Sequence, residues 1–183
     1  TTLAFVQQVN KRGVAASLAL QPTANISSGN RLIVEAGVWS AGNASASGVT
    51  DSAGDTYTKL TSLKASDNTE LSVWSAPITA GAGTKPTITV TTTASADIGA
   101  TVLEYSGLSS AGGTNVVDVL KTATGKTSAA STVSSGATAA SNAAGELAMG
   151  FYADSGFANT LAGDPGYSVR TNVSPTNDME LLV

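Results

Sequence analysis

Short runs of alternating apolar and polar residues recur along the chain, and no window shows the 3.6-residue period of an amphipathic helix. Clusters of Gly, Asn, Asp and Ser separate these runs. Many short strands at such spacing are typical of two packed antiparallel sheets. The pattern therefore predicts an all-β, two-sheet sandwich of immunoglobulin-like or jelly-roll type with about ten strands. The runs are TLAFVQQV (2–9), VAASLAL (14–20), RLIVEAGVW (31–39), TYTKLTSL (56–63), TELSVWSA (69–76), PTITVTT (86–92), GATVLEYS (99–106), NVVDVL (115–120), ELAMGFYA (146–153), YSVRT (167–171) and DMELLV (178–183).

Residues 122–144 have the small-residue composition of a flexible linker. Because they lie between two strand-like runs, we interpret them as loops around one further strand, TSAASTVS (127–134). A chain of 183 residues is long enough for one sizeable core. We predict a single sandwich domain over residues 1–183, with residues 1–12 as a donor or edge strand.

Alternation also assigns side chains to the two faces of each strand. In RLIVEAGVW, Leu32 and Val34 lie on the face opposite Trp39. In ELSVWSA, Leu71 and Val73 are taken as core, which places Trp74 on the other face. Both tryptophans are then expected to point away from the core. Three environments remain open for them: loops of the same domain, a subunit interface, or a sugar-stacking platform beside carboxylates.

The stretch GVTDSAGDTYTKL (48–60) holds two aspartates, Asp51 and Asp55, around Gly54. They are the candidate metal ligands of the chain, but the pattern lacks the spacing and distal Glu of a calcium loop. Asp side chains commonly cap tight turns through neighbouring backbone N–H groups. We therefore interpret both as hairpin-turn residues, and we expect no metal and no calcium dependence of the fold.

The amino-acid composition excludes several classes of function. Charged residues make up 12% of the chain, about half the usual share, while Ser and Thr make up about a quarter. A net charge of −4 does not suit nucleic-acid binding. Without His or Cys there can be no Ser–His machinery, thiolate catalysis or disulfide. No run of residues is long and apolar enough for membrane insertion.

The motifs VTDSAGDTYTKL, WSAP, TITV and EYSGLS resemble those of a module found in bacterial extracellular proteins and phage virion proteins. The resemblance covers roughly residues 30–183. It implies an immunoglobulin-like or jelly-roll sandwich, an extracellular location and a display or binding role without catalytic residues. It also implies that a strand rich in Ala, Gly and Thr follows DMELLV, so a sandwich without that strand would present an unpaired edge.

Two further chemistries remain open on the residues alone. Glu35 and Glu104 lie inside apolar runs and could form an acid–base pair of a glycosidase, but the chain lacks the polar groups expected around one. Lys11 and either Asn172 or Asn177 could form an isopeptide bond near a buried carboxylate. Solvated lysine and turn asparagine are the simpler interpretation of these residues.

We expect a non-enzymatic structural protein, secreted, on a cell surface or on a virion exterior, that needs no cofactor and assembles with copies of itself into a filament or a particle decoration. The segment LAFV places Leu3 and Phe5 on one face and Val6 on the other, which suits a donor strand for a neighbouring sheet. The alternative is a carbohydrate-binding module in which Trp39 and Trp74 stack on polysaccharide.

Overall fold

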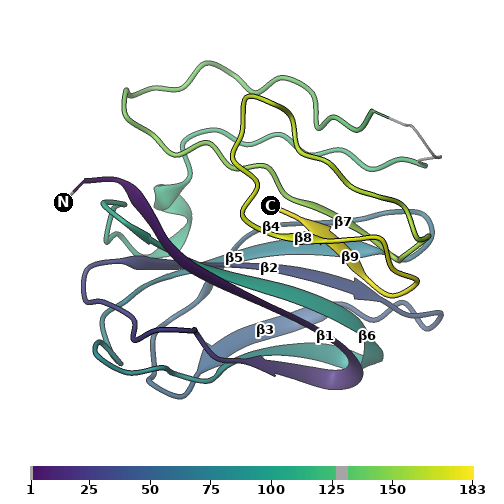
Figure 1. Ribbon diagram of the computed structural model, residues 1–183, viewed down its shortest axis with the longest axis horizontal. Helices are drawn as coiled ribbons and strands as arrows, with labels where there is room; N and C mark the ends of the chain where they lie inside the picture. The colour runs from purple at the N-terminus through teal and green to yellow at the C-terminus, as the bar shows by residue number, and fades with distance from the viewer. Residues whose placement is uncertain (1, 127–131) are drawn as a thin grey trace.

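The computed structural model describes residues 2–126 and 132–183, and nearly all of its regular structure is β, which confirms the predicted fold class (Figure 1). Within these residues there are nine strands and one 3-10 helix. Their bounds are β1 (Ala4–Leu20), β2 (Arg31–Trp39), β3 (Ala46–Asp51), β4 (Thr58–Lys64), β5 (Glu70–Pro77), β6 (Ile88–Ser106), η1 (Gly113–Val116), β7 (Tyr152–Asp154), β8 (Asn172–Val173) and β9 (Glu180–Leu182).

Six strands form one antiparallel sheet in the order β1-β6-β2-β5-β4, with β3 also paired to β6. Residues 88–92 of β6 pair with β3, whereas residues 97–105 pair with β2. Strand β1 pairs with β6 on both sides of this division. The sheet therefore bends along β1 and β6 and folds back over itself, as the lower part of Figure 1 shows.

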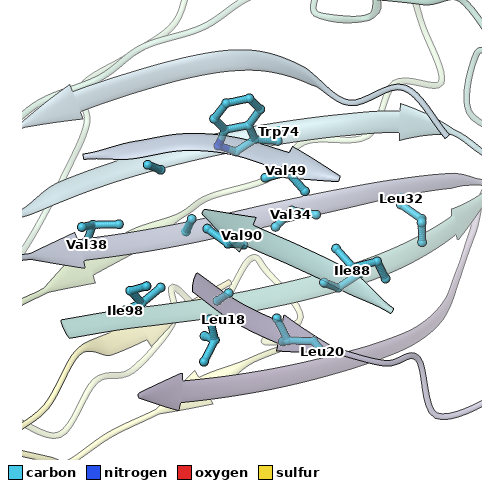
Figure 2. Close-up of a cluster of buried hydrophobic side chains, with 14 of the residues drawn as sticks. Leu18, Leu20, Leu32, Val34, Val38, Val49, Trp74, Ile88, Val90 and Ile98 are labelled. Atoms are coloured by element: carbon cyan, nitrogen blue, oxygen red, sulfur yellow. The ribbon is translucent and has the colours of Figure 1, made fainter. Parts of the chain in front are cut away.

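The main hydrophobic core lies between the two parts of this folded sheet (Figure 2). One wall comes from β1, β3 and the first part of β6, and includes Leu18, Val49 and Val90. The opposite wall comes from β2, β5 and the second part of β6, and includes Val34 and Ile98. Alternation in β2 predicts this inward face correctly, since its members are Leu32, Val34, Ala36 and Val38.

The other face of β2 and β6 is covered by the C-terminal layer, which we define as β7, β8, β9 and the loops that join them. Its strands form a separate sheet in the order β7-β9-β8. The layer approaches most closely at Gly37 and Gly99, where Met179 and Leu181 occupy the space that a Cβ atom would need. The central strands are thus buried on both faces, and every residue of β2 from Arg31 to Val38 is buried.

Strand boundaries differ from the sequence expectation in two ways. The runs at 2–9 and 14–20 lie in one strand, β1, and the runs at 86–92 and 99–106 lie in one strand, β6, because the ladder continues through the gap in β1: residues 10–13 pair with residues 98–101. In contrast, the runs at 115–120 and 167–171 belong to no strand, and only Tyr152–Asp154 of the region around 146–153 is paired. Most of the expected strand at 127–134 lies outside the described residues.

Candidate functional site

Asp51 caps the turn that follows β3. Its Oδ1 accepts hydrogen bonds from the backbone N–H groups of Ala53, Gly54 and Asp55 at 2.9, 2.7 and 3.1 Å. Its Oδ2 accepts a hydrogen bond from the Tyr57 hydroxyl at 3.0 Å. Burial, followed by the charge of Asp51, raises the pKa of Tyr57, so the hydroxyl stays protonated as the donor. Asp51 therefore acts as the turn residue that its sequence context predicts.

Asp55 joins this turn to the loop after β5. Its Oδ1 accepts from the backbone N–H groups of Thr79 and Ala80 at 2.8 and 2.7 Å, and from the Thr79 hydroxyl at 2.9 Å. Both aspartates thus use carboxylate oxygens to accept hydrogen bonds from protein N–H and O–H groups. In the parts of the chain that the structure describes, no group of three or more acidic, His or Cys side chains is placed to hold a metal ion.

Trp74 lies in the main core, 7% exposed, and pairs across the sheet with Val34 (Figure 2). Its indole N–H donates to the Ser72 hydroxyl at 2.9 Å, and Lys59 Nζ lies 4.7 Å from the ring centroid. The prediction that Trp74 points away from the core is therefore wrong. Because β5 is covered on both faces, alternation alone does not distinguish the main core from the opposite face.

Trp39, at the end of β2, lies on the opposite face from Trp74 and is partly exposed. Its indole N–H donates to the backbone carbonyl of Asp67 at 2.8 Å, which fixes the ring against the loop between β4 and β5. Across the sheet its partner is Asp97 of β6. Burial and the neighbouring Asp178 raise the pKa of Asp97, while a hydrogen bond from the Met179 backbone N–H lowers it.

The segment that sequence analysis proposes as a donor strand pairs with β6 of its own chain and lies at the edge of the sheet. Leu3 and Phe5 pack on the second hydrophobic cluster, which lies under the C-terminal layer. The Phe5 ring meets Tyr105 edge-on at 5.5 Å between centroids, and the guanidinium of Arg170 lies 4.4 Å from the Phe5 centroid. Val6 is 44% exposed, at a shift in the β1–β6 register.

Glu35 and Glu104 lie on opposite faces of the sheet. Glu35 pairs with Thr101, whereas Glu104 pairs with Leu32, whose side chain belongs to the main core. Side chains of adjacent positions on a strand project to opposite sides, so the sheet separates the two carboxyl groups. They cannot act together on one substrate as a glycosidase pair.

The two carboxyl groups also have opposite environments. Glu104 accepts hydrogen bonds from the Gln7 side chain, the Ser27 backbone and the Asn30 side chain at 2.6, 3.0 and 2.7 Å. Glu35 is fully buried and neither of its oxygens has a hydrogen-bond partner. Burial raises the pKa of Glu35 well above its ordinary value, because a charge there would lose its hydration without compensation. Glu104 therefore links β6 to β1 and to the loop before β2, whereas Glu35 is a buried polar residue whose hydrogen-bonding capacity is unsatisfied.

Two of the residues considered for an isopeptide bond, Lys11 and Asn172, make hydrogen bonds elsewhere. Lys11 Nζ donates to the backbone carbonyl of Ala19 at 3.0 Å. The Asn172 amide donates to the carbonyl of Leu161 at 2.9 Å. The structure does not bring these two side chains together.

Arg31 is a buried residue whose role the sequence did not indicate. Its guanidinium donates to the carbonyls of Ser109 and Ala111 and to the Ser75 hydroxyl, so it holds the chain that leaves β6. Burial lowers its pKa. A basic residue at the start of a strand-like run carries no local signal for these contacts, since its acceptors lie 44, 78 and 80 residues away.

Comparisons with models of protein families, with curated proteins and with solved structures found no match to this chain. Among the described residues, no helix is both long and apolar enough to cross a membrane.

Proposed function

We propose that this chain is a non-enzymatic structural protein of an extracellular or virion surface, and that its copies join by exchanging the N-terminal part of β1. The position of β1 carries the proposal. It is the terminal strand of the sheet order, and its first residues anchor on the second hydrophobic cluster through Leu3 and Phe5. A terminal strand held by two apolar anchors can be supplied equally well by a neighbouring copy.

Exchange of this strand preserves every contact that the strand makes within one chain. Leu3 and Phe5 are partly buried, so each contributes less than the about 1.5–3 kcal/mol of a fully buried side chain, whichever copy supplies them. The backbone ladder from Ala4–Ser106 onward fixes the register of the exchanged strand. Reciprocal exchange closes a dimer, whereas head-to-tail exchange builds an open filament. The low share of charged residues supports such assembly, because a surface rich in Ser and Thr costs little to desolvate.

Two single-cysteine variants test this proposal, because the natural chain contains no Cys. Ala4 and Ser106 are cross-strand partners at the end of the β1–β6 ladder, at a separation that a disulfide can bridge. When differently tagged Ala4→Cys and Ser106→Cys chains are refolded together and oxidised, exchange should give mixed disulfide dimers.

The control is the same pair of variants folded separately and mixed only afterwards. Mixed dimers should be abundant after joint refolding and scarce in this control. A product that contains only monomers and same-variant dimers, together with a monomeric mass for the unmodified chain by light scattering, would refute strand exchange.

A further inference from the structure

Strand pairing places three side chains in one row at the end of the sheet where β2 stops. Val14 of β1 and Trp39 of β2 are both direct partners of Asp97 of β6, so all three project from the same face. The row spans two strand spacings, about 10 Å. We call Val14, Asp97 and Trp39 the Trp39 row. It lies at the border of the C-terminal layer, one step beyond Gly37 and Gly99.

The Trp39 row is open to solvent. Val14 is 75% exposed, and Trp39 is partly exposed. The only polar atom of the indole is already bonded to Asp67, so the ring presents carbon surface. Between the two apolar side chains lies the half-buried carboxylate of Asp97, whose pKa the nearby backbone N–H of Met179 lowers. An apolar surface with an acceptor in its middle offers the two kinds of contact that a ligand site combines.

A second exposed aromatic residue, Phe157, lies on a turn with unusual backbone geometry. Phe157 is 64% exposed and lies between Gly156 and Ala158, whose φ angles are 86° and 54°. The left-handed region is unfavourable for alanine, so other contacts must hold the turn. The N–H of Gly156 donates to the Asp154 carboxylate at 2.8 Å, and the N–H of Ala158 donates to the Thr176 carbonyl at 2.8 Å.

Two residues of the Phe157 turn contact residues that neighbour the Trp39 row. Gly156 packs against the backbone of Asp178, which directly precedes the Met179 N–H that bonds to Asp97. The Ser155 hydroxyl donates to Asp67, the same residue whose carbonyl holds Trp39. The loops meet at one end of the sandwich, on the right in Figure 1. An exposed phenylalanine on a fixed, strained turn is expected where the ring contacts a ligand.

Charge defines the kind of ligand. The charged residues that take part in the contacts of the row and the turn are Asp67, Asp97, Asp154 and Asp178, and Arg12 Nη1 lies 3.5 Å from Asp178 Oδ2. This negative surface disfavours nucleic acid, phosphate and acidic glycans. Aromatic rings stack on the C–H faces of sugars, and carboxylates accept hydrogen bonds from sugar hydroxyl groups.

We propose that the Trp39 row and Phe157 form a binding site for a neutral polysaccharide, with the two rings as stacking surfaces and Asp97 as the acceptor between them. This role is separate from strand exchange, because β1 contributes only Val14 to the site. Trp74 has no part in it.

Native gel electrophoresis in the presence of soluble β-glucan, xylan or galactomannan tests the site. At least one of these polymers should retard the wild-type chain. Trp39→Ala and Phe157→Ala should each weaken the retardation at least tenfold, and Asp97→Asn should weaken it as well. Tyr167→Ala is the matched control, since Tyr167 is also an exposed aromatic residue, 56% exposed, outside the row. This control should bind like the wild type.

A second measurement keeps the test valid if Trp39→Ala fails to fold. Of the two tryptophans, Trp74 is buried, so acrylamide quenching of fluorescence reports mainly on Trp39. The retarding polymer should reduce this quenching in the wild type but not in Phe157→Ala. Three outcomes overturn the proposal: no retardation by any of the three polymers, unchanged binding in the Phe157→Ala and Asp97→Asn variants, or a change in oligomeric mass in place of a change in binding. Equal affinity for polygalacturonate would overturn the assignment of a neutral ligand.

Discussion

Glu35 and Glu104 show how two residues of one type, in similar sequence surroundings, contribute to stability with opposite sign. Each lies within an apolar run of a central strand. Glu104 meets three donors and is satisfied, whereas Glu35 meets none. A buried polar group without a partner costs about 1–3 kcal/mol, and a satisfied one is costly to remove. The two residues differ because Glu104 lies on the main-core face of the sheet, whereas Glu35 lies on the face that the C-terminal layer covers.

Replacing Glu35 by Gln is expected to flatten the dependence of stability on pH. Burial raises the pKa of Glu35, so the folded chain keeps a proton that the unfolded chain releases above the ordinary pKa of 4.5. The free energy of unfolding should therefore fall by up to about 1.4 kcal/mol per pH unit as the pH rises from 4.5 towards the raised pKa. Urea unfolding of the wild type and Glu35→Gln between pH 5 and 8 measures this difference.

Glu104→Gln is the matched control, because it leaves Glu35 intact. It should lower the free energy of unfolding by about 1–3 kcal/mol, because an amide no longer accepts from all three donors. The slope of this free energy with pH should stay as in the wild type. Parallel curves for the wild type and Glu35→Gln would show that Glu35 does not carry the pH dependence.

At the scale of single elements, the alternation of residues predicted strands better than it predicted their surroundings. It located β2, β4, β5 and β6, and it identified the inward face of β2. It failed for Trp74 because β5 is covered on both sides, so both faces carry apolar residues. The Trp39 row was not predictable, because its members come together only through the register of three strands. That register includes a shift between Ala15 and Ser17 that no local pattern marks.

The contact between β6 and the C-terminal layer depends on a missing side chain. A Cβ atom at Gly99 would lie 2.7 Å from Met179 Cγ and 3.1 Å from Met179 Cβ. Gly99→Ala is therefore expected to displace the layer and to destabilise the protein by about 1–3 kcal/mol. Gly13→Ala is the control on the paired strand, because the nearest atom there is Leu18 Cδ1 at 3.4 Å, and its effect should be smaller.

A double-mutant cycle with Met179→Ala identifies the cause. If the clash with Met179 is responsible, Gly99→Ala should cost less in the Met179→Ala background than in the wild type. Equal costs in both backgrounds, measured by chemical denaturation, would assign the effect to β6 itself.

The whole molecule consists of two parts that are held together differently. The folded sheet is continuous, because β1 and β6 run through both of its layers. The C-terminal layer forms a separate sheet, whose strands contain two or three residues. Side-chain packing therefore carries most of its attachment, and local opening of this layer needs no break in the main ladder.

Hydrogen exchange should reveal this hierarchy. Amides of β2 and of the second half of β6 are expected to exchange slowest, at rates close to global unfolding, and amides of β7, β8 and β9 to exchange faster by orders of magnitude. Mass spectrometry of peptic peptides can compare the two groups. Equal protection of β9 and β2 would mean that the layer and the folded sheet unfold as one unit.

The pairing of β1 with β6 also sets an order of events during synthesis. β1 leaves the ribosome first, but its partner is complete only when residue 106 has emerged, 86 residues after Leu20. At about 5–20 residues per second, a nascent chain carries an unpaired β1 for several seconds or more. Throughout that interval the anchors Leu3 and Phe5 have no partner on their own chain. On a polysome, where neighbouring chains are at different stages of completion, a β6 from a chain ahead is already available to them.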